Sequence, residues 1–391
     1  MLARLFALAA IFACTSIAWV ILGATINART NETGSRLRGR VESVWGAPQV
    51  QFAPRAVDPN VTRAPTGGDL AVNLALEHRK KGLLWYSTYT VTFQGDYDFR
   101  NDSTESRLVQ FWWPVPGKSA IYDDLQFQVD GETLEPQNHT ASMLVTKRVA
   151  AGATARLRVS YRSQGLQSWR YRFGDGVTAA PNFHLSVTTN FKNADFADNT
   201  LAPTTRQETA TGLNLDWAYT NLFSGYEIAV VMPEKAQPGP LAARISYFAP
   251  VSLLFFFFLM FIITTLRGIE LHPMNYFFLA CAFFAFHLLL AYLADHVDLY
   301  VSFAVSAAVS VALVVSYLRI VAGARFALRQ AALAQIVYLV LFSFAFFFEG
   351  YTGLAVTIGS ILTLFVVMQM TGRIRWAEKF GPAAPPMPAR T

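Results

Sequence analysis

Residues 247–266 read YFAPVSLLFFFFLMFIITTL and contain no charged side chain. A helix needs roughly 20 mostly apolar residues to cross a bilayer, and helices in soluble cores rarely run this long without a charge. We therefore interpret the stretch as a membrane span. Five further stretches have the same apolar character, namely 5–26, 275–294, 299–318, 331–348 and 352–371.

The composition of the whole chain agrees with several spans. Of its 391 residues, 53% are hydrophobic and only 15% are charged, whereas an ordinary soluble domain carries about 25% charged residues. This composition excludes a soluble globular enzyme. The two cysteines, Cys14 and Cys281, both lie inside apolar runs, so we expect no disulfide framework and no cysteine-based metal site.

The first apolar run is interpreted as an uncleaved signal anchor. Its core, Leu5 to Ala24, is longer than the roughly 7–15 residues of a typical signal-peptide core. The small-residue sites that follow it are also poor cleavage sites. A cleaved signal peptide is the alternative.

The distribution of Lys and Arg predicts the orientation in the membrane. If the N-terminus is cytoplasmic, the cytoplasmic segments hold nine basic and two acidic residues, a net charge of +7, and the remainder carries −1. We therefore predict a multi-pass membrane protein with both termini cytoplasmic and residues 27–246 external. The basic composition then reflects topology, and no nucleic-acid partner is expected.

Residues 27–246 form a long polar insertion between the first and second spans. From about residue 85 the period of the sequence changes to two, as in 89–93, 125–129 and 155–161, which is typical of half-buried strands. Asp130-Gly131 directly follows one such segment and signals a two-residue hairpin. About nine short strands of this kind indicate an antiparallel β-sandwich, or two small ones in tandem.

The predicted fold is an α+β membrane protein with an N-terminal signal-anchor helix, an external antiparallel β-sandwich and a C-terminal five-helix transmembrane bundle. The predicted segments are an anchor at 1–26, a helical extension and linker at 27–84, the β-sandwich at 85–235, the five helices at 246–372 and a disordered cytoplasmic tail at 373–391.

Polar residues near the spans are candidates for a functional or structural polar cluster: Glu270, His272, His287, Asp295 and His296. His287 lies in the middle of a span, where an ionisable group indicates function by default. A neutral imidazole that is hydrogen-bonded to a neighbouring helix would explain its presence equally well. Asp295 and His296 lie at a membrane edge and either take part in metal or proton chemistry or terminate helices.

Glu270 and His272 lie in the turn before Pro273, where the helix dipole favours an acidic residue. We expect them to fix the helical hairpin; a proton-linked pair at the inner face is the rival reading. No HExxH motif or close histidine pair occurs, so we predict no catalytic, metal or cofactor site. Small residues spaced four apart at 302–312 and 355–363 favour close helix packing over an intramembrane nucleophile.

Three motifs resemble the CreD family of inner-membrane proteins. Residues 44–49 read VWGAPQ, similar to the VWG-x-PQ element that follows the first span in that family, and residues 78–83 are similar to its R-x-x-G lead-in. Residues 267–276 contain a turn ending in HPxxY that opens the third span. The resemblance implies a bacterial inner-membrane protein of cell envelope integrity and stress response, and it supplies no catalytic residues.

We therefore expect a non-enzymatic inner-membrane protein that contributes to envelope integrity or the stress response through its external β domain. Its expected partners are the lipid bilayer and, through the external domain, envelope proteins or cell-wall components. The alternative is a small-molecule transporter or permeation subunit that uses polar groups within the six-helix membrane part. A transporter should have broken helices and polar residues near the midplane, whereas these spans are Phe-rich and continuous.

Overall fold

The computed structural model describes residues 2–58, 61–81, 84–117, 120–139, 141–176, 178–348 and 350–372. The predicted tail at 373–391 lies outside the described residues. The chain divides into two compact units, a β unit of Thr33–Ala236 and a helical unit of Met1–Glu32 with Gln237–Thr391. The expected combination of a large β-sheet region with several apolar helices is confirmed.

Six helices among the described residues are long and apolar enough to cross a membrane, and they match the six predicted stretches. The helices are α1 (Leu2–Trp45), α2 (Pro238–Arg267), α3 (Pro273–Leu293), α4 (Leu299–Val321), a composite helix at 324–347, and α8 (Thr352–Thr371). The composite helix consists of α5 (Ala324–Phe326), η1 (Ala327–Ala331), α6 (Ala332–Gln335), η2 (Ile336–Leu341), α7 (Phe342–Phe344) and η3 (Ala345–Phe347), with π-helical turns in η1 and η2.

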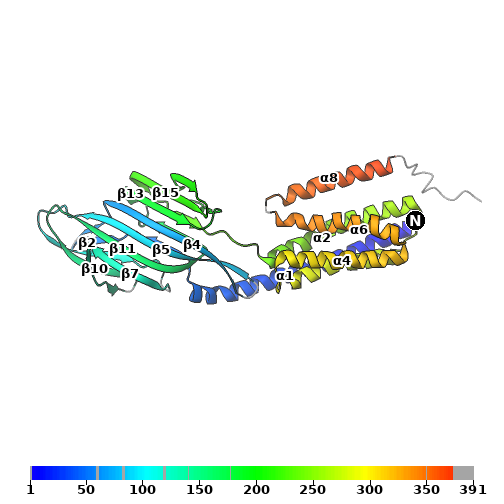
Figure 1. Ribbon diagram of the computed structural model, residues 1–391, viewed down its shortest axis with the longest axis horizontal. Coiled ribbons are helices and arrows are strands. Elements are labelled where there is room, and N and C mark those ends of the chain that lie inside the picture. Colours follow the sequence, from blue (N-terminus) through cyan, green and yellow to red (C-terminus); the bar gives the residue numbers. More distant parts are fainter. Residues whose placement is uncertain are drawn as a thin grey trace, which may run out of the picture. The chain divides into compact units, whose positions relative to one another are not determined.

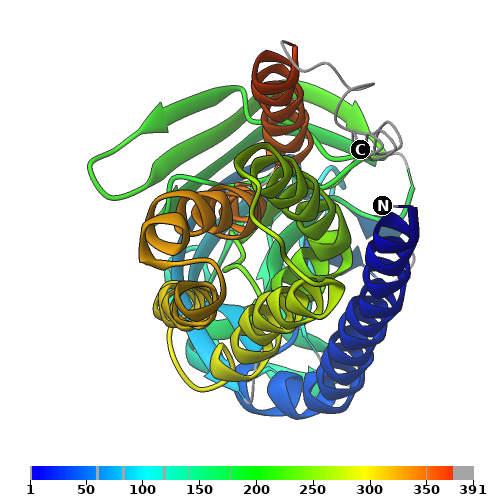
Figure 2. The ribbon, with the colours of Figure 1, turned by 90° about the vertical axis from the view of Figure 1, so that its right-hand side faces the viewer.

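Within the helical unit, α1 and α8 lie at the periphery of the helices (Figure 2). One face of α4 packs inward because its serines are small. Ser302, Ser306 and Ser310 are fully buried, and the Ser310 hydroxyl donates to the carbonyl of Ala282 in α3 over 2.6 Å. Small residues therefore permit close packing along α4. In α8 the packing interpretation does not hold at Gly359, which has open space around its Cβ position.

The strands of the β unit follow each other along the chain. They are β1 (Gln49–Phe52), β2 (Arg55–Asp58), β3 (Val61–Arg63), β4 (Gly67–Lys81), β5 (Leu84–Arg100), β6 (Arg107–Pro114), β7 (Tyr122–Val129), β8 (Glu132–Thr133), β9 (Gln137–His139), β10 (Ser142–Val149), β11 (Thr154–Leu166), β12 (Ser168–Arg172), β13 (Thr178–Thr189), β14 (Thr205–Glu208), β15 (Leu213–Ser224) and β16 (Ile228–Val231).

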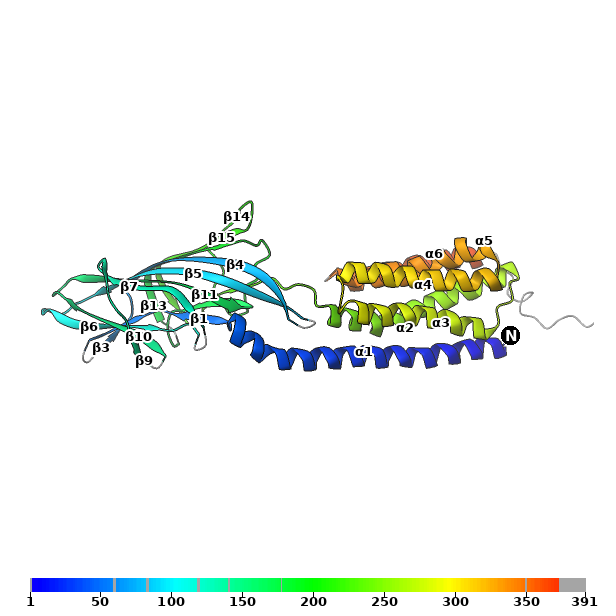
Figure 3. The same ribbon diagram turned by 60° about the horizontal axis from the view of Figure 1, so that its bottom comes forward.

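These strands form three sheets. The largest has eight strands in the order β14-β15-β13-β4-β5-β11-β7-β8, and its long central strands run side by side in Figures 1 and 3. The second sheet has the order β3-β2-β6-β10-β9 and the third β1-β12-β16. All three contribute to one hydrophobic core, which includes Phe93, Trp113 and Trp169. Fully burying an aromatic or aliphatic side chain of this size contributes roughly 1.5–3 kcal/mol.

Two predictions about this unit are wrong. The sheets are not purely antiparallel, because β4 pairs with β13 in parallel and β1 pairs with β12 in parallel. A tight turn imposes antiparallel pairing only on strands adjacent in sequence, and these pairs are distant in sequence. Residues 49–81 are also not a linker, because they contain β1 to β4, and β4 is a central strand. The predicted helical extension is present, since α1 runs to Trp45.

The hairpin prediction at Asp130-Gly131 is confirmed. Val129 in β7 pairs with Glu132 in β8, and Asp130 and Gly131 have φ values of 52° and 82°. Two successive positive φ angles are the signature of a type I′ turn, which matches the twist of the flanking strands.

The residues that join α1 to the first strand are fixed by close contacts. Gly46 has a φ of 90°, and a Cβ atom there would lie 2.3 Å from the carbonyl oxygen of Gln164. The buried Gln49 side chain donates from Nε2 to Ser163 Oγ and to the Gln164 carbonyl, both over 2.8 Å. The VWGAPQ segment therefore anchors the chain against β11.

Candidate functional site

The five predicted polar residues do not form one site. Glu270 and His272 precede α3, whereas Asp295 and His296 follow it, and α3 is about 30 Å long because a helix rises 1.5 Å per residue. Each therefore has its own surroundings.

His272 acts at the helix terminus. Its Nδ1 accepts the backbone N–H of Met274 over 3.2 Å, which makes it the N-cap of α3. The expected contacts of His272 with Glu270 or Arg267 are not formed within the described residues. Gly268 ends α2 in the left-handed conformation at a φ of 68°, the usual arrangement for a helix C-terminus.

Asp295 pairs with the N-terminal helix. Its carboxylate lies 2.9 Å from Arg29 Nη2 and its side chain is 9% exposed. The same guanidinium donates to the carbonyl of Ala291 and lies over the ring of Tyr292. This set of contacts holds α1 against the end of α3 within the helical unit, which is a structural role.

His287 is buried in the middle of α3. Its Nδ1 lies 2.9 Å from the carbonyl oxygen of Phe283 in the preceding turn, and its ring meets Trp19 of α1 edge-on at 5.7 Å. Nε2 has no hydrogen-bond partner among the described residues. The ring is thus one part of an aromatic contact between α1 and α3.

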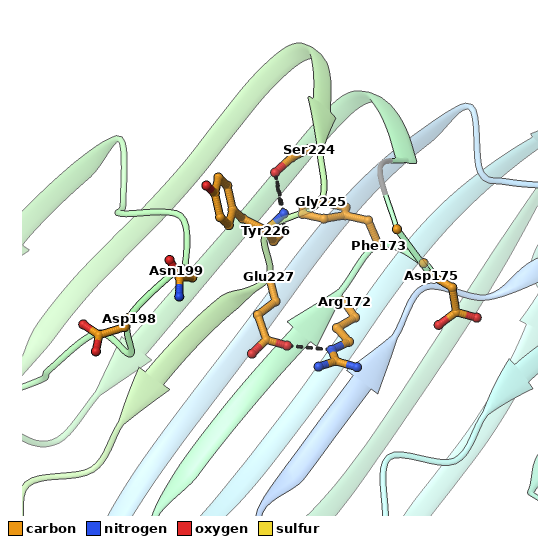
Figure 4. A pocket seen from close by; sticks show the side chains of 11 residues that line it. Arg172, Phe173, Asp175, Asp198, Asn199, Ser224, Gly225, Tyr226 and Glu227 are labelled. Carbon is orange, nitrogen blue, oxygen red and sulfur yellow. Dashed lines mark hydrogen bonds and ion pairs between the residues drawn. The ribbon is translucent and has the colours of Figure 1, made fainter.

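The candidate site that the structure does bring together is a pocket in the β unit, with a volume of about 480 Å³. It is made by three turns. One follows β12, one joins β15 to β16, and the third is the loop that precedes β14 (Figure 4). Its lining residues are Arg172, Phe173, Gly174, Asp175, Gly176, Asp198, Asn199, Ser224, Gly225, Tyr226 and Glu227.

The floor of the pocket is an ion-paired carboxylate. Glu227, whose side chain is 12% exposed, accepts from Arg170 on one carboxylate oxygen and from Arg172 Nε over 2.6 Å on the other. Burial by itself raises the pKa of this carboxyl, but the hydrogen bonds and charges of Arg172 and Arg170 outweigh it, so the pKa is lowered. Glu227 therefore stays ionised and both of its oxygens are engaged.

The loop with Asp198 and Asn199 is held in place by β16 and by Glu227 directly before it. Asp195 forms a backbone bridge with Val231 and Thr200 one with Glu227, so the loop is attached at both ends. Between them the Thr200 hydroxyl donates to the Ala197 carbonyl over 2.6 Å, and Asn199 turns the chain with a φ of 59°. These contacts within the protein therefore fix this edge of the pocket without a ligand.

An exposed aromatic ring lies beside this loop. The backbone N–H of Tyr226 donates to Ser224 Oγ over 2.9 Å, which fixes the turn, and the Tyr226 side chain is 57% exposed. In Figure 4 this ring lies on the same side of the pocket as Asn199 and Asp198.

The sequence analysis did not predict this pocket. Its residues come from Gly-Asp-Gly, Asp-Asn and Ser-Gly-Tyr turns, and such residues are common in any turn. Nothing in the sequence of these turns indicates that they meet in one pocket.

A family model of "Inner membrane protein CreD" matches residues 55–377. The chain belongs to the CreD family. The match covers most of the β unit and all the described helices after α1, so it agrees with the resemblance carried by residues 267–276. A CreD-family chain with several apolar helices is a multi-pass protein of the inner membrane.

No curated protein matches the chain. Among solved structures, a "putative nutrient binding protein" of Legionella pneumophila is 10% identical with a TM-score of 0.35, over 53% of this chain and 76% of that one. An M1 zinc metallopeptidase mutant of Deinococcus radiodurans is 15% identical with a TM-score of 0.26, over 44% of this chain and 42% of the peptidase. Similarity this low carries no argument about this CreD-family chain.

Proposed function

We propose that this chain is a non-enzymatic inner-membrane protein that contributes to envelope integrity or the envelope stress response by binding an envelope component with its β unit. The proposal includes both termini in the cytoplasm and residues 27–246 in the periplasm, a sandwich arrangement of the β unit and one bundle of the five C-terminal helices. Family membership and the charge distribution of +7 against −1 support it.

The observation that carries the binding function is the pocket around Glu227. Its carboxylate is paired on both oxygens by arginines and its pKa is lowered, so it is poorly suited to exchange protons during a reaction. The turns around it are already held by backbone bridges and side-chain hydrogen bonds. A prearranged polar pocket of this kind favours recognition of a ligand.

The polar groups inside the helices favour packing over permeation. Gln335 Nε2 donates to Ser310 Oγ over 2.8 Å, and Ser310 in turn donates to Ala282. Tyr338 likewise donates to Thr363 over 2.9 Å. Hydrogen bonds of this type link neighbouring helices in membranes, so these groups are engaged with one another.

The test is complementation of a strain that lacks the gene, scored by detergent sensitivity and an envelope-stress reporter. The wild-type chain should restore both readouts, and a Tyr226→Ala/Asn199→Ala variant should restore neither although it reaches the same level in the membrane. The matched control, Phe223→Ala, removes an exposed aromatic ring that does not line the pocket and should complement fully. Full complementation by the pocket variant would overturn the assignment of function to this site.

A further inference from the structure

The pocket around Glu227 has a nearly balanced charge. Glu227, Asp175 and Asp198 contribute three carboxylates, and Arg172 together with the adjacent Arg170 contributes two guanidinium groups. Both arginines are ion-paired with Glu227, so neither offers an uncompensated positive charge to a phosphate or a carboxylate ligand. A strongly anionic ligand is therefore disfavoured, and the small net charge gives little attraction to a strong cation.

The groups that are free for a ligand are planar and polar. Asp175, Asp198 and Asn199 are exposed, and no hydrogen bond of their side chains occurs among the described residues. Carboxylates accept only, whereas an amide both donates and accepts. Together they match a ligand that carries several hydroxyl groups on neighbouring carbons.

The remaining feature is the aromatic ring at the edge. Tyr226 presents an exposed face on the same side of the pocket as Asn199 and Asp198 (Figure 4). An aromatic face is apolar and carries partial negative charge, so it packs well against the C–H face of a sugar ring. The pocket volume of about 480 Å³ lies within the range of about 300–1,000 Å³ for small-molecule sites.

We propose that this pocket binds a neutral saccharide of one or two rings. The ring of Tyr226 packs on the apolar face of one sugar, while Asp198 and Asn199 form hydrogen bonds with its hydroxyl groups. Glu227 and its two arginines keep the floor rigid. The inference rests on the proposed function, because it gives the chemical class of the envelope component that the β unit recognises.

The experiment measures saccharide binding to the purified full-length chain in nanodiscs by saturation-transfer NMR. The probes are N,N′-diacetylchitobiose, maltose and cellobiose, with spermidine as a cationic comparison. We expect at least one disaccharide to bind saturably and spermidine not to compete with it. Tyr226→Ala and Asp198→Asn should each weaken that binding at least about tenfold, equivalent to 1.4 kcal/mol or more, whereas Phe223→Ala should leave it unchanged.

A conservative variant keeps the test decisive. Tyr226→Phe retains the ring and should retain binding, so a variant that fails to fold is recognised by comparison with it. The inference is overturned when none of the three disaccharides binds, when only spermidine binds, or when binding is unaffected by Tyr226→Ala and Asp198→Asn. Loss of complementation without saccharide binding refutes this inference alone, whereas saccharide binding in a chain whose deletion has no phenotype refutes the proposed function alone.

Discussion

At the scale of single residues, Gly46 combines two constraints on the side chain it could carry. Two separate effects exclude a side chain there, since the backbone has a φ of 90° and a Cβ atom would lie 2.3 Å from a carbonyl oxygen. Gly152 shares only the first effect, with a φ of 67° and no atom near its Cβ position. Comparing substitutions at the two glycines therefore separates the free-energy cost of the left-handed backbone conformation from the cost of a steric clash.

We expect Gly46→Ala to lower the thermal unfolding midpoint of the β unit clearly more than Gly152→Ala does. The left-handed conformation alone costs an L-residue roughly 1–2 kcal/mol, and only Gly46→Ala must also displace the backbone at Gln164. Tryptophan fluorescence during heating measures the unfolding midpoint of each variant. Equal shifts for the two variants would show that the contact at Gly46 is not close.

The ion pairs of Glu227 predict a pH dependence of stability. Because its pKa lies below the ordinary value of 4.5, ionised Glu227 stabilises the folded chain above that value, and the contribution disappears as the pH falls through the folded pKa. Glu227→Gln should therefore unfold at a lower temperature than wild type near neutral pH, and the difference should shrink as the pH falls below 4.5.

The matched control is Glu132→Gln, which alters an exposed ion pair with Lys147 in which the Glu132 side chain is 64% exposed. Exposed pairs contribute about 0–1 kcal/mol, so this variant should unfold close to wild type at every pH. A Glu227→Gln chain as stable as wild type at neutral pH would contradict the assigned role.

At the scale of elements, the turn between α2 and α3 is defined by the residues that end one helix and begin the next. Gly268 terminates α2, His272 caps α3 and Pro273 occupies the first turn of α3, while Tyr276 is fully buried. The HPxxY motif is thus explained by helix capping, by a proline where no backbone donor is needed and by one buried ring.

His272→Ala should destabilise the helical unit by about 0.5–2 kcal/mol, the usual cost of removing an N-cap. His272→Asn supplies another good cap and should behave as wild type in both membrane level and complementation. Glu270→Gln should also complement, because Glu270 is exposed and pairs with neither His272 nor Arg267 in the described part of the chain. The structural reading fails if His272→Asn and Glu270→Gln accumulate normally yet lose function, since both remove only a titratable group.

The elements were predictable where the signal is local. Long apolar runs gave the helices, and Asp130-Gly131 gave its hairpin, because each depends on residues adjacent in sequence. The place of β4 was missed although Leu70, Val72 and Leu74 alternate inward, since the Pro- and Gly-rich segment before it resembles a linker. The pocket was not predictable at all, because Asp198, Tyr226 and Arg172 meet only through strand pairing.

At the scale of the whole molecule, the charge distribution predicts the topology. Basic residues are enriched in the segments assigned to the cytoplasm, where Lys and Arg are retained during insertion. Alkaline phosphatase fused after Gly131 should be active, and the same enzyme fused after Thr391 should be inactive. The reverse activities would overturn the predicted orientation, and activity at both positions would place the C-terminus outside.

The parallel pairing of β4 with β13 also determines when the sheet can be completed during synthesis of the chain. Asp69 and His184, which face each other in this pair, are 115 residues apart in the chain. At a synthesis rate of about 5–20 residues per second, roughly 6–23 s pass between the synthesis of β4 and that of β13. During that interval one edge of the growing sheet is open, and an open edge is where another chain can pair. The nascent β unit is therefore exposed to wrong pairing until β13 has been made.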